Sequence, residues 1–274
     1  MNSHIQVPNG IIKNFRIDVH GKKRVFFLDL ESLVIRDESS KYIGAQEGFY
    51  SESIDVALNK YVETPITKLI ADIKRGEWIP GAVKCGYNQD KAFEILKNYC
   101  LAGIARSDSA RKNLEQNSVY APFVNEQFKH DVLIAVTLDG AYPSHYGLPG
   151  ININECKFCI LKNENPRPFI LNRSGMYSVK NKGDMESLVF PVAPDMALMF
   201  VPSAMVNWEL SDGSLPCISI DDSEGIAGMN IQAIKFEYIM NPSLLISNSK
   251  EELEGALLFI NNNVDQLEEF GAYR

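Results

Sequence analysis

The sequence predicts an α+β fold, with an N-terminal β-hairpin, a central helical segment and a C-terminal, largely antiparallel sheet with two helices. Strand-like segments lie near both ends and helix-like segments between them, without the regular alternation of a parallel α/β sheet. The chain has 274 residues, of which 45% are hydrophobic, so it can bury a large core. Because neither a repeat nor a low-complexity linker divides it, we expect a single domain over residues 1–274. Its expected sub-regions are a hairpin (1–50), a helical part (51–118) and a sheet with helices (128–274).

The first expected element is the hairpin. Residues 12–19 and 24–30 alternate moderately between apolar and polar side chains. Gly21 lies between them and can adopt the positive φ that a tight turn requires. Residues 32–36 can add a third strand, whereas residues 42–50 show no clear period, so we expect irregular structure there.

The helical part begins near Ser51 or Ser53, whose hydroxyl groups can cap a helix. Apolar residues at helical spacing continue on both sides of Pro65, as far as Gly76. Proline lacks the N–H that a helix interior uses, so we expect a kink at Pro65 or two abutting helices.

A second helix is expected after Asn88, its N-cap, with apolar residues at helical spacing as far as Ile104. Ser107 or Asp108 can cap a further helix that ends near Asn117.

The C-terminal half has the pattern of strands and turns, followed by helices. The apolar run 131–138 is expected to form a buried strand, and residues 139–150, rich in Pro and Gly, a long turn segment. Further strands are expected at residues 157–161, 168–171, 188–192, 197–201, 217–220 and 244–247. Helices are expected at residues 229–240 and 250–261.

Composition narrows the classes of function. A formal net charge of −8 argues against a surface that grips nucleic acid by broad phosphate neutralisation, although it leaves room for a local basic cleft. The apolar runs are far shorter than the roughly 20 residues that a membrane-spanning helix needs. The N-terminus has neither the basic flank nor the apolar stretch of a signal peptide. We therefore expect a soluble, cytoplasmic protein with no membrane partner.

The five cysteines do not form a disulfide pattern, because their number is odd and their spacing irregular. Cys156 and Cys159 have the spacing of redox and zinc pairs, but a zinc site needs a second ligand pair. In a strand, residues three apart point to opposite faces. We expect buried thiols, assign no metal site and identify no cofactor.

Three basic residues are candidates for a functional site, and each also has a structural interpretation. His4 can act as a general acid or base near neutral pH, or can bridge the terminal segment to a buried carboxylate or carbonyl group. Arg106 and Arg111 lie near an expected helix N-terminus, where two guanidinium groups can hold an anion or can form salt bridges.

Two further candidates are Glu63 and Asn165. Glu63 lies where Pro65 must distort the helix, so its carboxylate can serve as a base, a metal ligand or an arginine partner, or can be a solvated surface group. Asn165 follows an expected strand and precedes a proline, which is typical of turns and of side chains presented to a cleft. The sequence carries no glycine-rich phosphate loop and no G-x-S-x-G motif.

Taken in order, several segments resemble an uncharacterised family, the domain-of-unknown-function family 4238. HIQVPNGIIKNF is similar to its His-x-x-Pro element and Asn-Phe ending, with one extra residue between His4 and Pro8. EGFY at residues 47–50 also matches, as does IARSDSAR at residues 104–111, which is similar to Arg-Thr-Pro-x-x-Arg. ILKNENPRPFIL at residues 160–171 is similar to a strand leading to Ser-Asp-Asn-Pro.

The resemblance implies that His4, Glu63, Arg106, Arg111 and Asn165 share one family pattern, and therefore one polar site. The family is mostly bacterial, and some members are found among anti-phage defence genes. We therefore expect an effector with a hydrolase- or nuclease-like activity on a phosphate-containing substrate, a nucleotide or nucleic acid. Arg106 and Arg111 would hold the anion, His4 would act as acid or base, and Glu63 would orient it or bind a metal.

Two alternatives stay open. One is a non-catalytic sensor or binding module that recognises a phage or partner protein, with the polar cluster as an internal network that fixes the terminal segment. The other is a structural subunit whose C-terminal helix, Leu253 to Ile260, packs on a partner, such as a second copy in a homo-oligomer.

Overall fold

The computed structural model describes residues 2–4, 6–107, 110–112, 126–138, 151–180, 185–208, 213–240 and 243–272. Within these residues, mainly antiparallel sheets combine with helices in an α+β arrangement, which confirms the predicted fold class. Among the helices of this described part, none has both the length and the apolar character that crossing a membrane requires.

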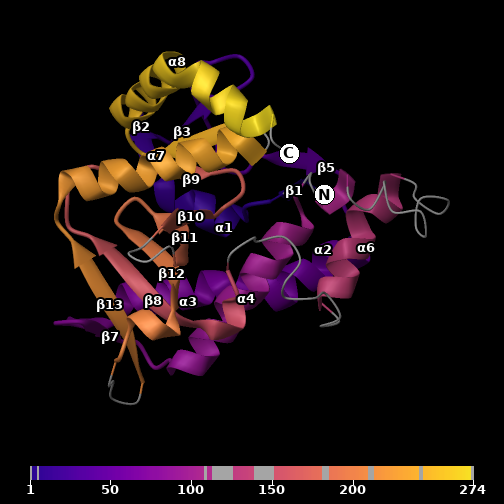
Figure 1. The fold of residues 1–274 in the computed structure, drawn as a ribbon. Coiled ribbons are helices and arrows are strands. Elements are labelled where there is room, and N and C mark those ends of the chain that lie inside the picture. The colour runs from indigo at the N-terminus through magenta and orange to yellow at the C-terminus, as the bar shows by residue number, and fades with distance from the viewer. Residues whose placement is uncertain are drawn as a thin grey trace.

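A seven-stranded sheet, in the order β10–β11–β12–β8–β13–β7–β6, forms the centre of the fold (Figure 1). Its neighbours pair antiparallel, except that β13 runs parallel to β8. The strands are β6 (Glu77–Ile79), β7 (Ala82–Lys84), β8 (Cys156–Asn163), β10 (Tyr177–Lys180), β11 (Glu186–Ala193), β12 (Met196–Pro202) and β13 (Ser214–Ile220).

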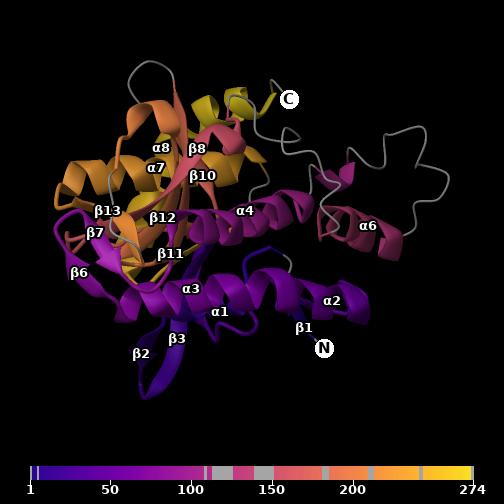
Figure 2. The same ribbon diagram turned by 90° about the horizontal axis from the view of Figure 1, so that it is seen from below.

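Helices cover both faces of this sheet, which explains why β8, β11 and β12 are almost continuously buried. The helix α4 (Gln89–Ala105) lies against one face and α7 (Ser223–Met240) against the other (Figure 2). Cys156 and Cys159 show the two faces within one strand, because Cys156 packs in the cluster on the α4 side and Cys159 in the cluster on the α7 side. This placement confirms that the two thiols do not converge.

A second sheet holds the predicted hairpin. Its order is β2–β3–β14–β9, and β4 pairs with β3. The turn at His20 and Gly21 has φ values of 52° and 75°, so both residues adopt the left-handed conformation that a tight hairpin needs. The strands are β2 (Ile17–Val19), β3 (Lys22–Asp29), β4 (Val34–Glu38), β9 (Leu171–Asn172) and β14 (Leu244–Ser247).

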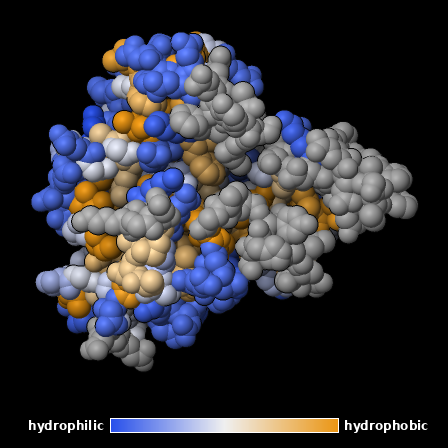
Figure 3. All heavy atoms as spheres, in the orientation of Figure 1, coloured by the Kyte–Doolittle hydropathy of each residue, from blue (hydrophilic) through white to orange (hydrophobic). Residues whose placement is uncertain are grey.

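The helix α8 (Lys250–Ala272) covers this second sheet. Leu253, Ala256 and Ile260 pack on Leu28 and Leu245, and they form a separate buried cluster. Hydrophilic side chains predominate over the top of the molecule in Figure 3, where α8 lies. This distribution agrees with the alternation of buried and exposed residues along α8.

The N-terminal segment differs from the prediction. A strand was expected from residue 12, but α1 (Asn9–Ile12) and the 3₁₀ turn η1 (Lys13–Phe15) precede β2. The physical reason is that Ile11, Ile12 and Phe15 have helical spacing and are all buried, so a helical turn delivers three side chains to one core. Before them, β1 (Asn2–His4) pairs with β5 (Ala45–Glu47), a strand within the segment expected to be irregular.

The expected disturbance at Pro65 takes the form of a π-helical turn, η2 (Asn59–Glu63), between α2 (Glu52–Leu58) and α3 (Thr64–Arg75). Since proline has no N–H to donate and its ring crowds the preceding turn, a wider turn before Pro65 lets the helix continue. The N-cap role of Asn88 is confirmed, because its side chain accepts a hydrogen bond from the Lys91 N–H.

The strand predicted at residues 131–138 is wrong, because this segment is the end of a helix, α6 (Glu126–Leu138). Short apolar runs fit either structure, and here the run packs on α4 and α2 rather than in a sheet. The Thr137 hydroxyl donates to the Leu133 carbonyl one turn earlier, as helical threonines commonly do. The helix predicted after Ser107 is described only at residues 110–112, and the turn segment 139–150 lies outside the described residues.

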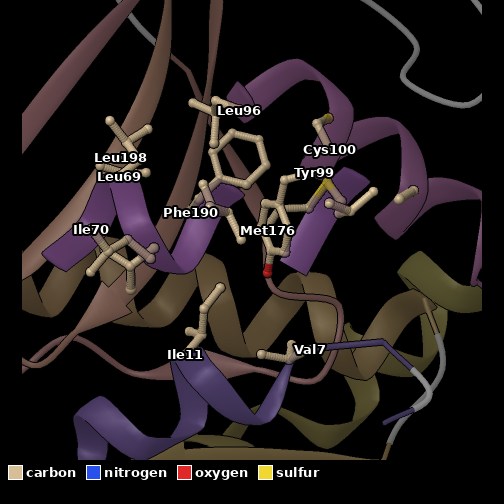
Figure 4. Close-up of a cluster of buried hydrophobic side chains, with 14 of the residues drawn as sticks. Val7, Ile11, Leu69, Ile70, Leu96, Tyr99, Cys100, Met176, Phe190 and Leu198 are labelled. Atoms are coloured by element: carbon tan, nitrogen blue, oxygen red, sulfur yellow. The ribbon is translucent and has the colours of Figure 1, made fainter. Parts of the chain in front are cut away.

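The largest core lies between the seven-stranded sheet and the helices α1, α3 and α4. Figure 4 shows Val7 and Ile11 of the N-terminal segment pointing towards Tyr99, Met176 and Phe190. These side chains are all buried. The segment from Val7 to Phe15 therefore contributes side chains to the core.

Candidate functional site

Arg106, at the C-terminal end of α4, is the centre of a polar cluster, and only 1% of its surface is exposed. Its Nη1 donates to the Gln6 carbonyl oxygen at 2.8 Å, and its Nη2 donates to Glu63 Oε1 at 3.0 Å. One buried guanidinium thus joins the N-terminal segment, the π turn and the end of α4.

Arg111 extends the cluster. Its Nη1 donates to the Arg106 carbonyl oxygen at 2.5 Å, and its guanidinium carbon lies 5.2 Å from the centre of the Phe49 ring. In the same way, the guanidinium carbon of Arg106 lies 6.0 Å from the centre of the Tyr50 ring. Burial raises the pKa of Tyr50 to about 12, so this ring stays a neutral phenol next to the two cations.

His4 lies at the edge of the same cluster. Its Nε2 is 3.3 Å from the Ser40 carbonyl oxygen, and this contact fits the tautomer that carries the proton on Nε2, since a carbonyl only accepts. Burial lowers the pKa of His4, while the Ser40 carbonyl and the Glu63 carboxylate oppose that shift. The imidazole is therefore neutral at neutral pH.

Glu63, the last residue of the π turn, links the buried cluster to a surface groove. The groove has a volume of about 390 Å³ and lies between the N-terminal segment and the outer side of α3. We call it the α3 groove; its walls include Asn9, Gly10, Asn59, Glu63, Thr67 and Lys68. With 27% of its side chain exposed, Glu63 faces Arg106 on one side and the groove on the other.

Local sequence explains how the groove forms. Gly10 lets the N-terminal segment approach α3 closely, because a Cβ atom there would lie 2.5 Å from Thr67 Oγ1. Pro65 accounts for the π turn, and the Thr64 hydroxyl holds this turn by donating to Asn59 Oδ1 at 2.7 Å. π-helical turns occur frequently at functional sites.

Asn165 makes its contacts elsewhere. Its Nδ2 donates to the Asp221 carbonyl oxygen at 2.9 Å, and its Oδ1 accepts from the Arg167 N–H at 3.0 Å. Its own N–H donates to Asn163 Oδ1. These contacts fix the turn after β8, so four of the five candidates lie together around Arg106 and Asn165 holds a separate turn.

Sequence reasoning did not identify Gln6, Asn9, Thr67 or Lys68 as parts of the site. Gln6 contributes a backbone carbonyl, for which no side-chain pattern exists. The groove residues come from two segments that only the fold brings together, so no spacing rule could have found them.

A second buried charged residue, Glu237 of α7, was also not predicted. Its Oε2 accepts hydrogen bonds from the N–H and the hydroxyl group of Ser174, both at 3.2 Å, and 1% of the residue is exposed. Burial raises its pKa to about 7, against the opposing effects of Ser174 and Arg173. Within the described residues, no group of three or more His, Cys, Asp and Glu side chains is arranged to hold a metal ion.

Comparisons of the chain with protein-family models, with curated proteins and with solved structures find no match. The resemblance to the domain-of-unknown-function family 4238 stays a prediction.

Proposed function

We propose that the protein is a non-catalytic sensor or binding module, of the kind that the family resemblance implies for anti-phage defence. Its binding site is the α3 groove. The observation that carries the proposal is the burial of Arg106, whose two terminal nitrogens already donate inside the protein, to Gln6 and to Glu63.

The internal hydrogen bonds of Arg106 and Arg111 argue against an anion-binding role for these two residues. A phosphate would have to displace the Glu63 carboxylate from Arg106 or lie against it, and a buried ion pair such as this one is costly to break because its buried member, here the Arg106 guanidinium, loses its counter-ion. Arg111 is also buried and donates to a backbone carbonyl. The two arginines therefore support a structural network better than an anion site.

The same network suggests how binding in the α3 groove affects the N-terminal segment. A group that binds in the α3 groove meets Glu63, which shares its carboxylate with Arg106. Arg106 in turn holds the Gln6 carbonyl, two residues after the strand β1. Occupation of the groove changes the charge that Arg106 faces, and the N-terminal segment responds through Gln6.

A second candidate function is the hydrolase- or nuclease-like activity on a nucleotide or nucleic acid. The observation that favours it is His4, whose pKa is lowered by burial so that a neutral imidazole lies close to Glu63. A neutral imidazole can act as a general base.

Phage-challenge assays with the full chain expressed in bacteria separate the two candidates. We expect His4→Gln to keep full protection, because the glutamine amide nitrogen takes the place of Nε2 and can still donate to the Ser40 carbonyl, and because sensing needs no proton transfer. We expect Glu63→Ala to lose protection, because it removes the group that joins the groove to Arg106.

Thermal melting of each variant is the control. A His4→Gln protein that melts like the wild type and no longer protects would favour the enzyme. A wild-type chain that gives no protection against any phage tested would overturn the defence role.

A further inference from the structure

We propose that the β9–β10 turn, residues 173–176, is a lid over the buried Glu237 carboxyl group, which opens as the pH rises and then loosens the N-terminal segment. The turn lies where α7, α4 and the N-terminal segment meet. The inference does not depend on the proposed function, because no ligand of the α3 groove enters it.

The first argument is the contact between the turn and Glu237. Ser174 donates from its N–H and from its hydroxyl group to Glu237 Oε2, both at 3.2 Å, and 1% of Glu237 is exposed. Both donors are neutral groups, whereas a buried carboxylate is normally paired with a cation. If the turn moves away, Glu237 exchanges these two donors for water.

The second argument is the distribution of charge around Glu237. Arg173, in the turn itself, is the cation that opposes the effect of burial. α7 also packs against β9, β10, β14 and α8, of which β9 and β14 carry no titratable side chain. The other titratable groups with described side chains on these elements are Tyr177 and Lys180 of β10, Glu224, Lys235 and Tyr238 of α7, and Lys250, Glu251, Glu252, Glu254 and the exposed Asp265 of α8.

These other described groups leave Glu237 without a close counter-ion. Burial raises the pKa of Tyr177, so its phenol is neutral, and Lys180 is exposed. The charged residues in the first turns of α8 lie beside an earlier part of α7, where Glu252 accepts from Asn230. On α7 itself, residues one or two positions apart do not face each other. The solvation of Glu237 therefore depends mainly on whether the turn covers it.

The third argument gives the direction of the pH response. Under the closed turn, burial raises the pKa of Glu237 to about 7. An open turn lets water reach the carboxyl group, whose pKa then returns towards its ordinary value of 4.5. Because the open form loses this proton more readily, ionisation shifts the equilibrium towards the open turn. Opening is therefore rarer at pH 5 than at pH 8.

The fourth argument links the turn to the N-terminal segment. A Cβ atom on Gly175 would lie 2.6 Å from the Tyr99 hydroxyl oxygen and 3.1 Å from Val7 Cγ2, so the backbone of the turn packs directly on both side chains. Arg173, Gln6 and Val7 line one small cavity of about 10 Å³, which can hold about one water molecule. An open turn therefore removes part of the packing that holds residues 6 and 7.

Hydrogen exchange of the full chain, followed by NMR at pH 5 and pH 8 and corrected for the intrinsic exchange rate, tests the proposal. The Ser174 N–H, which donates to Glu237, reports on the lid, and the Ile11 N–H, which donates to the Pro8 carbonyl, reports on the N-terminal segment. We expect the protection of both amides to fall by about tenfold or more from pH 5 to pH 8. Amides of β12 should stay better protected than either at pH 8.

Three variants locate the response. Glu237→Gln keeps an acceptor for Ser174 and does not titrate, so the protection of the Ser174 N–H should be the same at both pH values. Val7→Ala leaves Glu237 and Ser174 in place, so it should keep the pH response of the Ser174 N–H and reduce that of Ile11. The matched control Glu224→Gln changes an exposed residue of the same helix and should behave like the wild type.

The proposal is overturned if the protection of the Ser174 N–H is equal or higher at pH 8, or if Glu237→Gln keeps the pH response of the wild type. It is also overturned if Ser174 and the β12 amides exchange at one common rate, because the whole molecule then opens and not the turn. An Ile11 amide that ignores pH in the wild type would contradict the release of the N-terminal segment. The comparison of Ser174 with β12 needs only the wild type, so it decides the question even if Glu237→Gln fails to fold.

Discussion

Arg106 and Glu237 are equally buried, yet their charges are stabilised in different ways. Arg106 faces a carboxylate, a backbone carbonyl and the ring of Tyr50. Glu237 accepts hydrogen bonds from the backbone and hydroxyl groups of Ser174, with Arg173 near enough only to oppose part of the pKa shift. The first region therefore keeps a fixed charge that joins segments, whereas the second titrates near neutral pH. A buried charge that is paired with a counter-ion has a structural role. A buried carboxyl group whose hydrogen bonds come only from neutral donors is sensitive to pH.

The largest effect expected from this comparison is that of Arg106→Ala. The substitution removes two hydrogen bonds, leaves the Gln6 carbonyl oxygen without this partner and opens a void where a fully buried side chain packed, so the free energy of unfolding should fall by about 3 kcal/mol. The measurement is urea unfolding at pH 7. The matched control is Arg75→Ala, which breaks an ion pair with Asp72 in which the arginine side chain is 75% exposed. Exposed pairs contribute less than about 1 kcal/mol. Equal costs for the two variants would contradict a structural role for Arg106.

The second effect concerns Glu237→Gln and depends on pH. The folded pKa of about 7 lies above the ordinary value of 4.5, so the folded protein binds this proton more tightly than the unfolded chain. Stability is therefore lost as the pH rises from about 4.5 to 7, by roughly 3 kcal/mol in total. The glutamine side chain of the variant does not titrate, so the variant should gain stability relative to the wild type over this interval.

Unfolding curves of both proteins at pH 5 and pH 8 measure the difference. The variant and the wild type should differ little at pH 5 and most at pH 8. A difference independent of pH would show that Glu237 does not titrate in this range.

Much of this fold could be predicted from the sequence, and the exceptions are elements whose local pattern is either too short or too ambiguous to identify them. The strands β8, β11 and β12 were predicted because each is a long apolar run that ends at turn residues. β6 and β7 have only three residues each, too few to show a period. The run at residues 131–138 fits a strand or a helix equally well, and only its packing on α4 decided the outcome. Local pattern predicts elements, whereas tertiary contacts choose between ambiguous ones.

The candidate site was less predictable. The Arg106–Glu63 pair joins positions 43 residues apart, and no local pattern connects them. Both residues were candidates for local reasons, Glu63 because it lies beside Pro65 and Arg106 because it lies near an expected helix N-terminus. Glu237 was missed because it occupies one position of an otherwise ordinary helical pattern, and nothing in the sequence marks that position as buried.

A third, smaller effect sharpens the account of Glu237. Ser174→Ala removes the hydroxyl donor at 3.2 Å and should cost about 1 kcal/mol at pH 8, where Glu237 is ionised. The cost should be lower at pH 5, where the carboxyl group is protonated. Repeating the substitution in the Glu237→Gln background closes a double-mutant cycle. In that background the cost should be the same at both pH values; a persistent pH dependence would place the titrating group elsewhere.

The smallest effect is expected for His4, and it has the opposite sign to that of Glu237. Burial lowers the pKa of His4, so the unfolded chain binds this proton more tightly than the folded protein does. The stability linked to His4 is present above the ordinary histidine pKa of about 6.5 and is lost as the pH falls below it. His4→Phe removes this loss, so the variant should gain stability relative to the wild type between pH 7 and pH 5.

Unfolding curves of His4→Phe and the wild type at pH 8, 6.5 and 5 provide the measurement. The difference at pH 8 reports only packing and the lost contact with the Ser40 carbonyl, because the imidazole is neutral in both states there. Any change in this stability difference between pH 8 and pH 5 is caused by protonation of His4. If the variant instead loses stability relative to the wild type at pH 5, then His4 is stabilised as a cation by Glu63. In that case the charge on the Arg106 side of the molecule would not be fixed, and the contrast with Glu237 would fail.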